Sequence, residues 1–398
     1  MIFEAPPMGE AELFVLSEIE EIKKKLRFQL HEPRRWVGSL RKLSLARNMQ
    51  GSNSIEGYDA ELDDAAAVLV GEEPLDASDE TRLALEGYRN AMTFVLQLCQ
   101  DPDYQLDEQL IKSLHFMMTS YDLRNRPGRW RQGPIFVRND ESGETVHEGA
   151  DIDDVPTLMG ELVKAANTVP PDQSTIVTAA MAHLNLVMIH PFRDGNGRMA
   201  RCLQSLILAQ NGILSPVFMS IEEYLGRNTQ SYYDILATVG GGSWQPSRDA
   251  GPWVRYILTA HLRQAQTLRR RVREAELLWM AFDEIVEKRG LPERSVVAVF
   301  DAAMGIRVRR GTYQKNFEPE DDVSDQTASR DLRALVDAGL LVAQGEKRGR
   351  HYTASREIRE LTAGIRSQSK ARDNTDPFLV FEERKQAEKS GAQLSLSI

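Results

Sequence analysis

The chain has 398 residues, a formal net charge of −10 and 41% hydrophobic residues. These values predict a globular protein of two or three domains. The acidic balance excludes a protein that coats nucleic acid unspecifically, so any such contact needs a local basic patch. The two cysteines, Cys99 and Cys202, lie in apolar helical patterns and are expected to be buried thiols. No export signal and no bilayer-spanning stretch is visible, which predicts a cytoplasmic protein without membrane contact.

Helical periodicity dominates the first half of the chain. Apolar residues recur at spacings of three and four, which predicts helices over residues 10–30, 79–100, 106–120, 152–167 and 173–189, with another beginning near Trp36. Residues 133–147 differ, because two short apolar runs flank a polar segment with Ser142-Gly143. This pattern predicts a β-hairpin. Two strands alone are barely stable in water, so a hairpin inside a helical domain indicates a function.

The second half is also helical but changes character after residue 290. A helix is predicted from 198 to 211, ending near Gly212 and Pro216, and one or two long charged helices from 252 to 289. Over 291–356 a helix, a second helix capped by Ser324 and a Gly-rich basic hairpin follow one another, which is the layout of a winged helix. We therefore predict five regions: 1–100, 101–260, 261–290, 291–356 and a disordered tail over 370–398.

Residues 190–201 gather the chemistry of a phosphate site. They read His-Pro-Phe-Arg-Asp-Gly-Asn-Gly-Arg-Met-Ala-Arg and lie between two core helices. His190 suits a general base near neutral pH, and Asp194 is a hard oxygen ligand for Mg²⁺. Gly195, Asn196 and Gly197 allow a tight turn whose amides meet one anion at a helix start, beside the guanidinium groups of Arg198 and Arg201. A polar turn with surface salt bridges explains each residue singly but not the whole set, which predicts phosphoryl or nucleotidyl transfer.

This segment resembles the signature of the Fic family, His-Pro-Phe-x-Asp/Glu-Gly-Asn-Gly-Arg-x-x-Arg, at every defining position. The resemblance implies a mainly α fold in which a Fic-type helical core over 101–260 carries the loop and a β-hairpin flap, with the winged helix following. The usual activity of the family is AMPylation, the transfer of AMP from ATP to a Ser, Thr or Tyr hydroxyl of a target protein. Other members transfer phosphate or phosphocholine, and the phosphotransferase branch departs from the signature at the glycine kept here as Gly195.

The resemblance also implies a role for each residue. His190 takes the proton of the attacking hydroxyl, and Asp194 holds Mg²⁺ against the α and β phosphates of ATP. The cradle for these phosphates is formed by Gly195, Asn196, Gly197 and Arg198. Arg201 reaches the γ phosphate. A different class of function stays open, in which the loop only senses nucleotide and the chain is a DNA-binding regulator.

Residues 52–57, Ser-Asn-Ser-Ile-Glu-Gly, resemble the inhibitory motif of the family, Ser/Thr-x-x-x-Glu-Gly/Asn. On a helix Ser52 and Glu56 would share one face. The residues alone favour an N-cap serine and a first-turn glutamate on an exposed helix. By resemblance, Ser52, Glu56 and Gly57 form a brake in which Glu56 pairs with Arg201 and takes the place of the γ phosphate.

Three further expectations concern partners. The 133–147 hairpin, after Pro-Gly-Arg-Trp-Arg at 127–131, resembles the flap that binds the target protein as an added strand. Tyr233 is expected at the adenine, with a core tyrosine as the alternative, and Gly240 stands where relatives often carry Asn. The winged helix would present Gln326, Thr327, Arg330 and Arg333 with the wing residues Lys347, Arg348 and Arg350 to DNA or to a protein, although the acidic residues 318–322 would repel phosphates. The oligomeric state, including a homo-oligomer, is left open.

Overall fold

The computed structural model describes residues 1–31, 34–101, 104–138, 142–168, 170, 173–210, 215–317, 323–368 and 374–389. The chain folds as two compact units, each made of segments that are distant in sequence. Unit 1 contains residues 1–26, 90–266 and 372–398, and unit 2 contains 27–89 and 267–371. The N-terminal region predicted over 1–100 is therefore divided between the two units. Among the described helices, none has the length and apolar character that a bilayer crossing requires.

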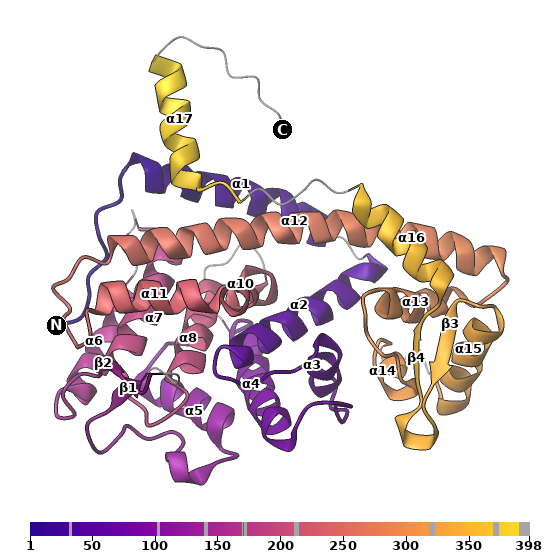
Figure 1. Ribbon diagram of the computed structural model, residues 1–398, viewed down its shortest axis with the longest axis horizontal. Helices are drawn as coiled ribbons and strands as arrows, with labels where there is room; N and C mark the ends of the chain where they lie inside the picture. The colour runs from indigo at the N-terminus through magenta and orange to yellow at the C-terminus, as the bar shows by residue number, and fades with distance from the viewer. Residues whose placement is uncertain are drawn as a thin grey trace. The chain divides into compact units, whose positions relative to one another are not determined.

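Helices make up most of both units, as predicted (Figure 1). Three helices extend from one unit into the other, namely α1 Glu10–His31, α4 Asp79–Leu98 and α12 Gly251–Lys288. The helices that lie in unit 1 alone are α5 Glu108–Thr119, α6 Val155–Asn167, α7 Thr175–Ile189, α8 Asn196–Gln210, α9 Pro216–Met219, α10 Glu222–Arg227, α11 Thr229–Gly240 and α17 Pro377–Lys389. The other helices belong to unit 2 and are α2 Arg35–Ser54, α3 Leu62–Leu69, α13 Val296–Ala303, α14 Arg310–Gln314, α15 Asp325–Asp337 and α16 Arg356–Ser367. The strands are β1 Phe136–Arg138, β2 Thr145–Glu148, β3 Leu341–Gln344 and β4 His351–Ala354.

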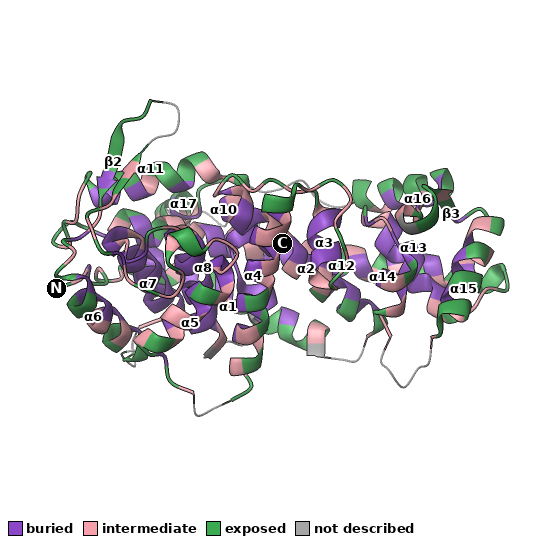
Figure 2. Cartoon of the chain, turned by 90° about the horizontal axis from the view of Figure 1, so that it is seen from below, coloured by how far each residue is buried: buried purple, intermediate pink, exposed green. Residues whose placement is uncertain are grey.

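Helices α7 and α8 form the centre of unit 1. The hydroxyl of Ser174 accepts a hydrogen bond from the Ile176 amide and begins α7. The sequence predicts one apolar face on this helix, but nearly every residue of α7 is buried, because α6, α8 and α12 surround it (Figure 2). The Trp253 indole of α12 donates to the Ala180 carbonyl at 2.8 Å and fixes that contact. The loop 190–195 therefore joins two rigid, fully packed helices.

The predicted hairpin forms from β1 and β2. Phe136 pairs with Glu148 and Val137 with His147, and the register shifts by one residue before Arg138. The Nε2–H of His147 donates to the Met188 carbonyl at 2.8 Å, which ties β2 to the end of α7. Most hairpin residues are exposed (Figure 2). Residues 139–141, which belong to the predicted hairpin, lie outside the described part of the chain.

In unit 2, α13, α15 and the β3–β4 hairpin follow in the order that the sequence predicts, and the short helix α14 lies between α13 and α15 without having been predicted. Ser324 caps α15 by accepting from the Thr327 amide, as predicted. An added bridge joins Val308 to Tyr352 of β4. The assignment of these elements as a winged helix stays a prediction. The acidic segment 318–322 and the side chain of Arg348 lie outside the described residues.

Two segments of unit 2 that are far apart in sequence are joined by ion pairs. The Arg307 side chain donates to Asp63 at 2.6 Å, to Asp76 at 2.7 Å and to Asp64 at 3.3 Å. The Lys42 ammonium of α2 lies 2.5 Å from the Asp301 carboxylate of α13. These contacts hold α2 and α3 against residues 301–307 and explain why the two segments share one unit.

The tail departs from its prediction. Residues 377–389 form α17, where polar composition predicts disorder, and residues 390–398 lie outside the described part. Two apolar side chains of α17 account for the difference. Phe381 lies 5.4 Å from the ring of Phe14 in α1, and the guanidinium of Arg255 lies 4.9 Å above the Phe378 ring. Burial of these rings against unit 1 offsets the conformational entropy that the tail loses when it forms α17. The polar composition alone does not predict this offset.

Candidate functional site

His190 ends α7 in a left-handed backbone conformation with φ of 54°. This conformation turns the chain out of the helix. The ring is half-buried, and its Nδ1 lies 3.1 Å from the Val187 carbonyl oxygen. A carbonyl only accepts, so Nδ1 carries the hydrogen and Nε2 keeps a lone pair. The imidazole is therefore oriented as a proton acceptor at Nε2.

Arg131 holds the loop from the side of the flap. Its Nε donates to the His190 carbonyl at 2.9 Å and its backbone amide donates to the Pro191 carbonyl at 2.8 Å. The same guanidinium also donates to the carbonyls of Gly133 and Ala150. The side chain is only 6% exposed, and burial lowers its pKa. The sequence places Arg131 just before the flap but does not predict that it binds the loop.

Asn196 closes the loop on itself. Its side-chain oxygen accepts from the Phe192 amide and its side-chain nitrogen donates to the Phe192 carbonyl, both at 2.9 Å. Phe192 is fully buried, so this pair anchors the loop in the core. The Asn196 side chain is thus committed to the backbone, and only its amide N–H remains for the predicted cradle.

The start of α8 has the geometry of an anion site. Gly195 has φ of +75°, and a Cβ there would meet Thr119 Cγ2 at 2.9 Å. Glycine is therefore required on both backbone and steric grounds. The helical hydrogen bonds begin with Met199 N–H to the Gly195 carbonyl, so the N–H groups of residues 196–198 precede the first N–H that donates within the helix. Such N–H groups and the helix dipole favour a negative charge at this point.

Two guanidinium groups lie inside the same turn of α8. Arg198 is 0% exposed and Arg201 is 1% exposed. Arg198 donates to the Tyr121 hydroxyl at 3.0 Å, and its other terminal nitrogen lies 3.7 Å from the Asp194 carboxylate. Buried cations are costly unless negative charge compensates them. Their position next to the amides of α8 strengthens the preference for an anion.

The carboxylate of Asp194 is suited to act as one ligand of Mg²⁺. Its side chain is 39% exposed, and one carboxylate oxygen accepts from Asn125 at 3.1 Å. Mg²⁺ is usually held by one or two carboxylates together with substrate phosphates, not by a protein cage. The described residues contain no group of three acidic, histidine or cysteine side chains able to hold a metal by themselves. The residues therefore fit Mg²⁺ bound together with a nucleotide.

His115 of α5 is a site residue that the sequence analysis misses. Its ring stacks on Phe192 with centroids 3.6 Å apart and planes 1° apart. Burial lowers the pKa of His115 to about 4, although the hydrogen bond with the Asp194 carbonyl opposes this shift. A signal was present, because His115 shares the inward face of its helix with Ile111 and Met118. A polar residue on such a face needs a buried partner.

Tyr232 and Tyr233 of α11 have different surroundings. Tyr232 is 1% exposed and hydrogen-bonds His183 Nε2 at 2.9 Å, while His183 Nδ1 lies 2.6 Å from the Gln204 oxygen. Burial lowers the pKa of His183 to about 3, and the Arg201 cation lowers it further. Tyr233 is 46% exposed, so the alternative of a core tyrosine applies to Tyr232 and not to Tyr233.

Gly240 ends α11 where relatives often carry Asn. A Cβ at Gly240 would meet the Met188 sulfur at 2.9 Å and the His147 ring at 3.6 Å. Asparagine would therefore require Met188 to move.

The inhibitory-type motif lies in unit 2, at the C-terminal end of α2. Ser52 is fully buried in the last turns of the helix, so the alternative of an N-cap serine is wrong. Gly57 has φ of +82°, and the Tyr58 and Gly57 amides donate to the carbonyls of Asn53 and Ser54. This is a Schellman motif, which explains the glycine physically. Glu56 is half-buried and directly follows the C-cap residue Ile55, at the end of the helix where the dipole is negative.

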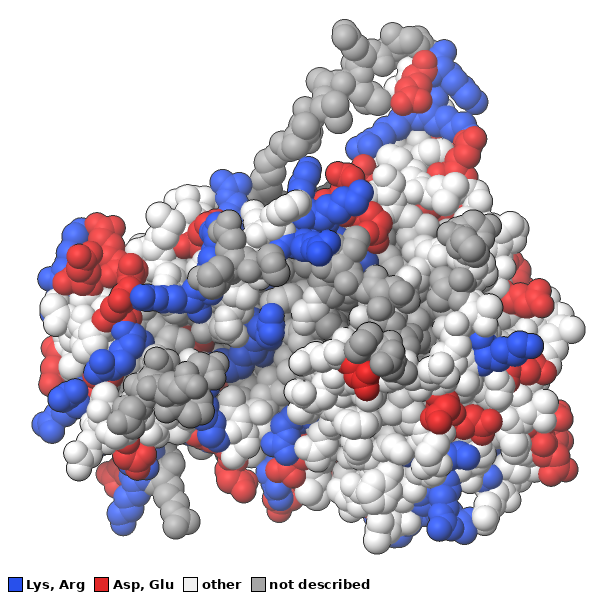
Figure 3. All heavy atoms as spheres, turned by 180° about the vertical axis from the view of Figure 1, so that it is seen from behind, with Lys and Arg blue, Asp and Glu red and all other residues white. Residues whose placement is uncertain are grey.

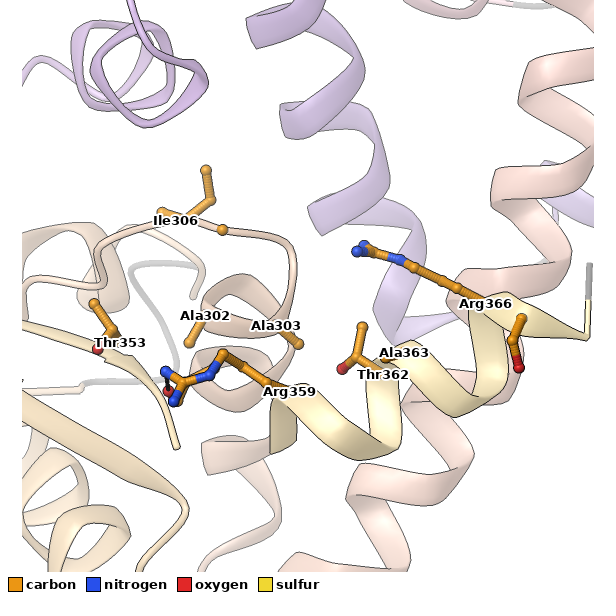
Figure 4. A pocket seen from close by; sticks show the side chains of 11 residues that line it. Ala302, Ala303, Ile306, Thr353, Arg359, Thr362, Ala363 and Arg366 are labelled. Atoms are coloured by element: carbon orange, nitrogen blue, oxygen red, sulfur yellow. Dashed lines mark hydrogen bonds between the residues drawn. The ribbon is translucent and has the colours of Figure 1, made fainter. Parts of the chain in front are cut away.

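A separate hollow of about 730 Å³ lies in unit 2 between α13, β4 and α16 (Figure 4). Small residues such as Ala302 and Ala363 form much of its wall, and Arg359 and Arg366 extend along it. The Arg359 guanidinium donates to the Ala354 carbonyl at 2.8 Å. None of the residues predicted for phosphate chemistry lines this hollow.

Comparison with known proteins relates part of this chain to a known family. The Fic/DOC family matches residues 105–208. The protein adenylyltransferase fic-1 of Caenorhabditis elegans is 38% identical over 91 residues, which cover 22% of this chain and 16% of that protein. The protein adenylyltransferase Fic of Nematostella vectensis is 30% identical over 138 residues, 33% of this chain and 26% of that protein. The matched segments thus span about a quarter or less of these curated relatives.

Solved structures extend the likeness in fold beyond the loop. A Fic family protein from Desulfovibrio desulfuricans G20 superposes with a TM-score of 0.55 at 21% identity, covering 88% of this chain and 98% of that one. A Fic domain containing signaling protein from Bacteroides thetaiotaomicron gives a TM-score of 0.52 at 22% identity, covering 66% of this chain and 97% of that one. Residues 105–208, which include the loop, thus match the Fic/DOC family, and the two solved structures show a similar fold over a larger part of the chain.

Proposed function

We propose that the chain is a protein adenylyltransferase, which transfers AMP from ATP to a Ser, Thr or Tyr hydroxyl of a target protein. The observation that carries the proposal is the orientation of His190. Its Nδ1–H donates to the Val187 carbonyl, so the lone pair of the ring lies on Nε2, and the residue stands at the start of the loop that leads into α8. A site that only binds nucleotide does not need such a base. The relatives named protein adenylyltransferases support the same chemistry.

In the proposed reaction, Nε2 of His190 removes the proton of the acceptor hydroxyl while its oxygen attacks the α-phosphorus of ATP. The new bond joins that oxygen to phosphorus, and the bond from the α-phosphorus to the β-phosphate oxygen breaks. AMP remains on the target and pyrophosphate leaves. The amides of residues 195–197 and the Arg198 guanidinium stabilise the phosphate charge, and Arg201 binds the γ phosphate.

Asp194 is the residue that would hold Mg²⁺ in this site. Bound Mg²⁺ would neutralise phosphate charge and align the α and β phosphates. The exposed ring of Tyr233 would cover the adenine on one side. Its exposure of 46% is compatible with a surface that a ligand covers.

The target protein would bind at the β1–β2 flap. Phe136 and Val146 are 45% and 39% exposed, which leaves apolar side chains on this hairpin for a partner. An extended segment could pair with a free strand edge and bring its hydroxyl to His190. Main-chain pairing of this kind would accept many sequences, so side-chain contacts with the flap would select the target.

The motif of Ser52, Glu56 and Gly57 would act as a brake. Glu56 at the negative end of α2 is destabilised by the helix dipole and gains from a nearby cation. Pairing with Arg201 would supply this cation and would occupy the position of the γ phosphate. ATP would then bind with its α phosphate turned away from attack.

The decisive experiment uses ATP labelled at either the α or the γ phosphate with the Glu56→Gly protein. Label from the α phosphate on protein supports AMP transfer, whereas label from the γ phosphate alone would indicate a kinase-like reaction. His190→Ala in the same background should abolish labelling and leave nucleotide binding unchanged. His351→Ala, a histidine of β4 in unit 2, is the matched control and should label at the parent rate. Equal labelling by the His190→Ala protein would refute the proposal.

A second candidate function is DNA binding by the predicted winged helix. Arg330 and Arg333 are exposed on α15, and among the described residues they have no ion-pair partner, as is also true of Lys347. Elsewhere acidic and basic side chains are intermixed, as on the face in Figure 3. Unpaired arginines on one helix of an acidic protein favour a local phosphate contact.

This candidate is tested with short duplex DNA at several salt concentrations. Replacement of Arg330 and Arg333 by Ala should weaken binding and lower the slope of log affinity against log salt by about two. Arg356→Ala, which removes an exposed arginine paired within α16, should change neither quantity. If the unaltered protein fails to bind duplex DNA at low salt, DNA binding is excluded, and this outcome leaves the enzymatic proposal untouched.

A further inference from the structure

The His115 side chain connects three parts of the site. Its Nδ1 accepts from the Gly128 amide at 2.9 Å, and its Nε2 lies 2.9 Å from the Asp194 carbonyl oxygen. An amide only donates and a carbonyl only accepts, so the ring is the neutral tautomer with hydrogen on Nε2. Both ring nitrogens are therefore satisfied, and the ring is fully buried. Such a residue has one orientation available to it.

The bond to the Asp194 carbonyl fixes the peptide that begins the anion site. Asp194 and Gly195 share this peptide, and Gly195 follows it with φ of +75°. Turning the peptide would move the Asp194 carbonyl away from His115 and would re-aim the amides that follow. The stack of His115 on Phe192 fixes the other end of the same loop, which Asn196 also holds. His115 thus braces the loop where its backbone is least usual.

The bond to Gly128 connects the loop with the segment before the flap. Gly128 has φ of +73°, and a Cβ there would meet the Lys112 carbonyl at 3.1 Å, so the chain passes close to α5. Three residues later, Arg131 donates to the carbonyls of His190 and Pro191. His115 and Arg131 therefore hold the two halves of the loop, and Gly128 joins them.

We propose that His115 is a positioning residue for nucleotide binding, which holds the Asp194–Gly195 peptide so that the first amides of α8 face one phosphate. The proposal rests on the proposed function for the identity of the ligand. His115 need not contact the nucleotide, because it acts through the backbone of the loop. Loss of its bond to Asp194 should therefore weaken nucleotide affinity more than the stability of the fold.

Three substitutions separate the contacts of His115. His115→Gln places an amide near the position of Nε2 and can still donate to Asp194. His115→Asn places its amide near Nδ1 and can still accept from Gly128. His115→Phe keeps a ring against Phe192 and removes both hydrogen bonds. The affinity of each full-length variant for a non-hydrolysable α,β-methylene analogue of ATP with Mg²⁺ is measured by calorimetry, beside its melting temperature.

The Asn and Phe variants both lose the hydrogen bond to Asp194 and should therefore bind the analogue about tenfold more weakly, as expected for one lost hydrogen bond at the site. The Gln variant should bind close to the unaltered protein, although it also lacks the aromatic ring. If the Asn variant binds as tightly as the Gln variant, or if affinity simply follows melting temperature across the three, the proposal is overturned. Binding is measured without turnover. Failure of AMP transfer with intact analogue binding would therefore refute the proposed function and leave this test valid.

Discussion

Asn196 binds the backbone of Phe192 through both of its side-chain groups, accepting from the amide and donating to the carbonyl at 2.9 Å. Asn196 is expected at the phosphates, but its side chain serves to close the loop, and we call this pair of bonds a clasp. The same two-bond arrangement also occurs at Asn185 of α7, which accepts from the Phe3 amide at 2.8 Å and donates to its carbonyl at 3.0 Å. Asn185 therefore provides a matched control.

Replacement of either asparagine by Ala should lower the free energy of unfolding by about 1–3 kcal/mol, since each leaves buried backbone groups without partners. Only Asn196→Ala should also weaken the binding of ATP with Mg²⁺, because only this clasp shapes the anion site. Urea unfolding and calorimetric titration measure the two effects. A parallel loss of nucleotide affinity in Asn185→Ala would show that affinity merely follows stability.

Glu56→Gly should raise self-labelling from α-labelled ATP by about tenfold or more, the effect expected from removing one charge-assisted pair. The substitution deletes the carboxylate while the Schellman turn at Gly57 can still form. Glu61→Gly, which removes another carboxylate a few residues later, should label at the unaltered rate. Equal stimulation by both substitutions would point to loosening of the segment and not to release of Arg201.

The buried His183 makes stability depend on pH. Its pKa falls from 6.5 to about 3 in the folded chain, mainly through burial. Between these values the unfolded chain binds the extra proton, so the contribution is complete above pH 6.5 and is lost as the pH falls towards 3. The groups facing His183 are Gln204, Tyr232, Trp253 and, through its charge, Arg201.

The slope from this one histidine should approach about 1.4 kcal/mol per pH unit. Urea unfolding at several pH values between 7 and 4.5 measures it. His183→Gln removes the titrating group and should be less stable at pH 7 but lose less stability on acidification. His351→Gln, at a half-buried position of β4 in unit 2, should keep the slope of the unaltered protein, and identical slopes in all three proteins would exclude His183 as the source.

Arg307 is expected to be the most sensitive ion-pair position in unit 2. Arg307→Met would leave Asp63 and Asp64, which are 5% and 1% exposed, without their shared cation. The loss should reach about 3–5 kcal/mol, as for other buried pairs that lose one partner. Arg356→Met, which breaks an exposed pair within α16, should cost less than about 1 kcal/mol. Similar small losses in both proteins would mean that water solvates the aspartates.

The sequence predicts the features that are local along the chain. The helices α7 and α8 follow from apolar spacing, and the β1–β2 hairpin from its short runs and Gly143. The loop is found by its motif because its residues are contiguous. What the motif does not tell is whether Asn196 works through its side chain or its backbone, since both uses require the same residue.

The contacts missed from sequence join distant positions. His115 and the Asp194 carbonyl are 79 residues apart, and Arg307 and Asp63 are 244 residues apart. Neither contact can be read from the periodicity of apolar residues. The sequence shows only a histidine on the inward face of α5 and two adjacent aspartates at the start of α3. The prediction of a disordered tail was wrong because two phenylalanines of α17 pack against α1 and α12, and this burial outweighs the polar composition.

The division of the chain has a consequence for shortened forms of the protein. Residues 27–89 and 267–371 build one unit, so a proteolytic cut or an early stop codon after α12 removes the surface on which α2 and α3 fold. The loop at 190–201 belongs to the other unit and keeps its own supports. If the brake works as proposed, loss of the C-terminal third should yield a more active, unrestrained fragment and not a dead one.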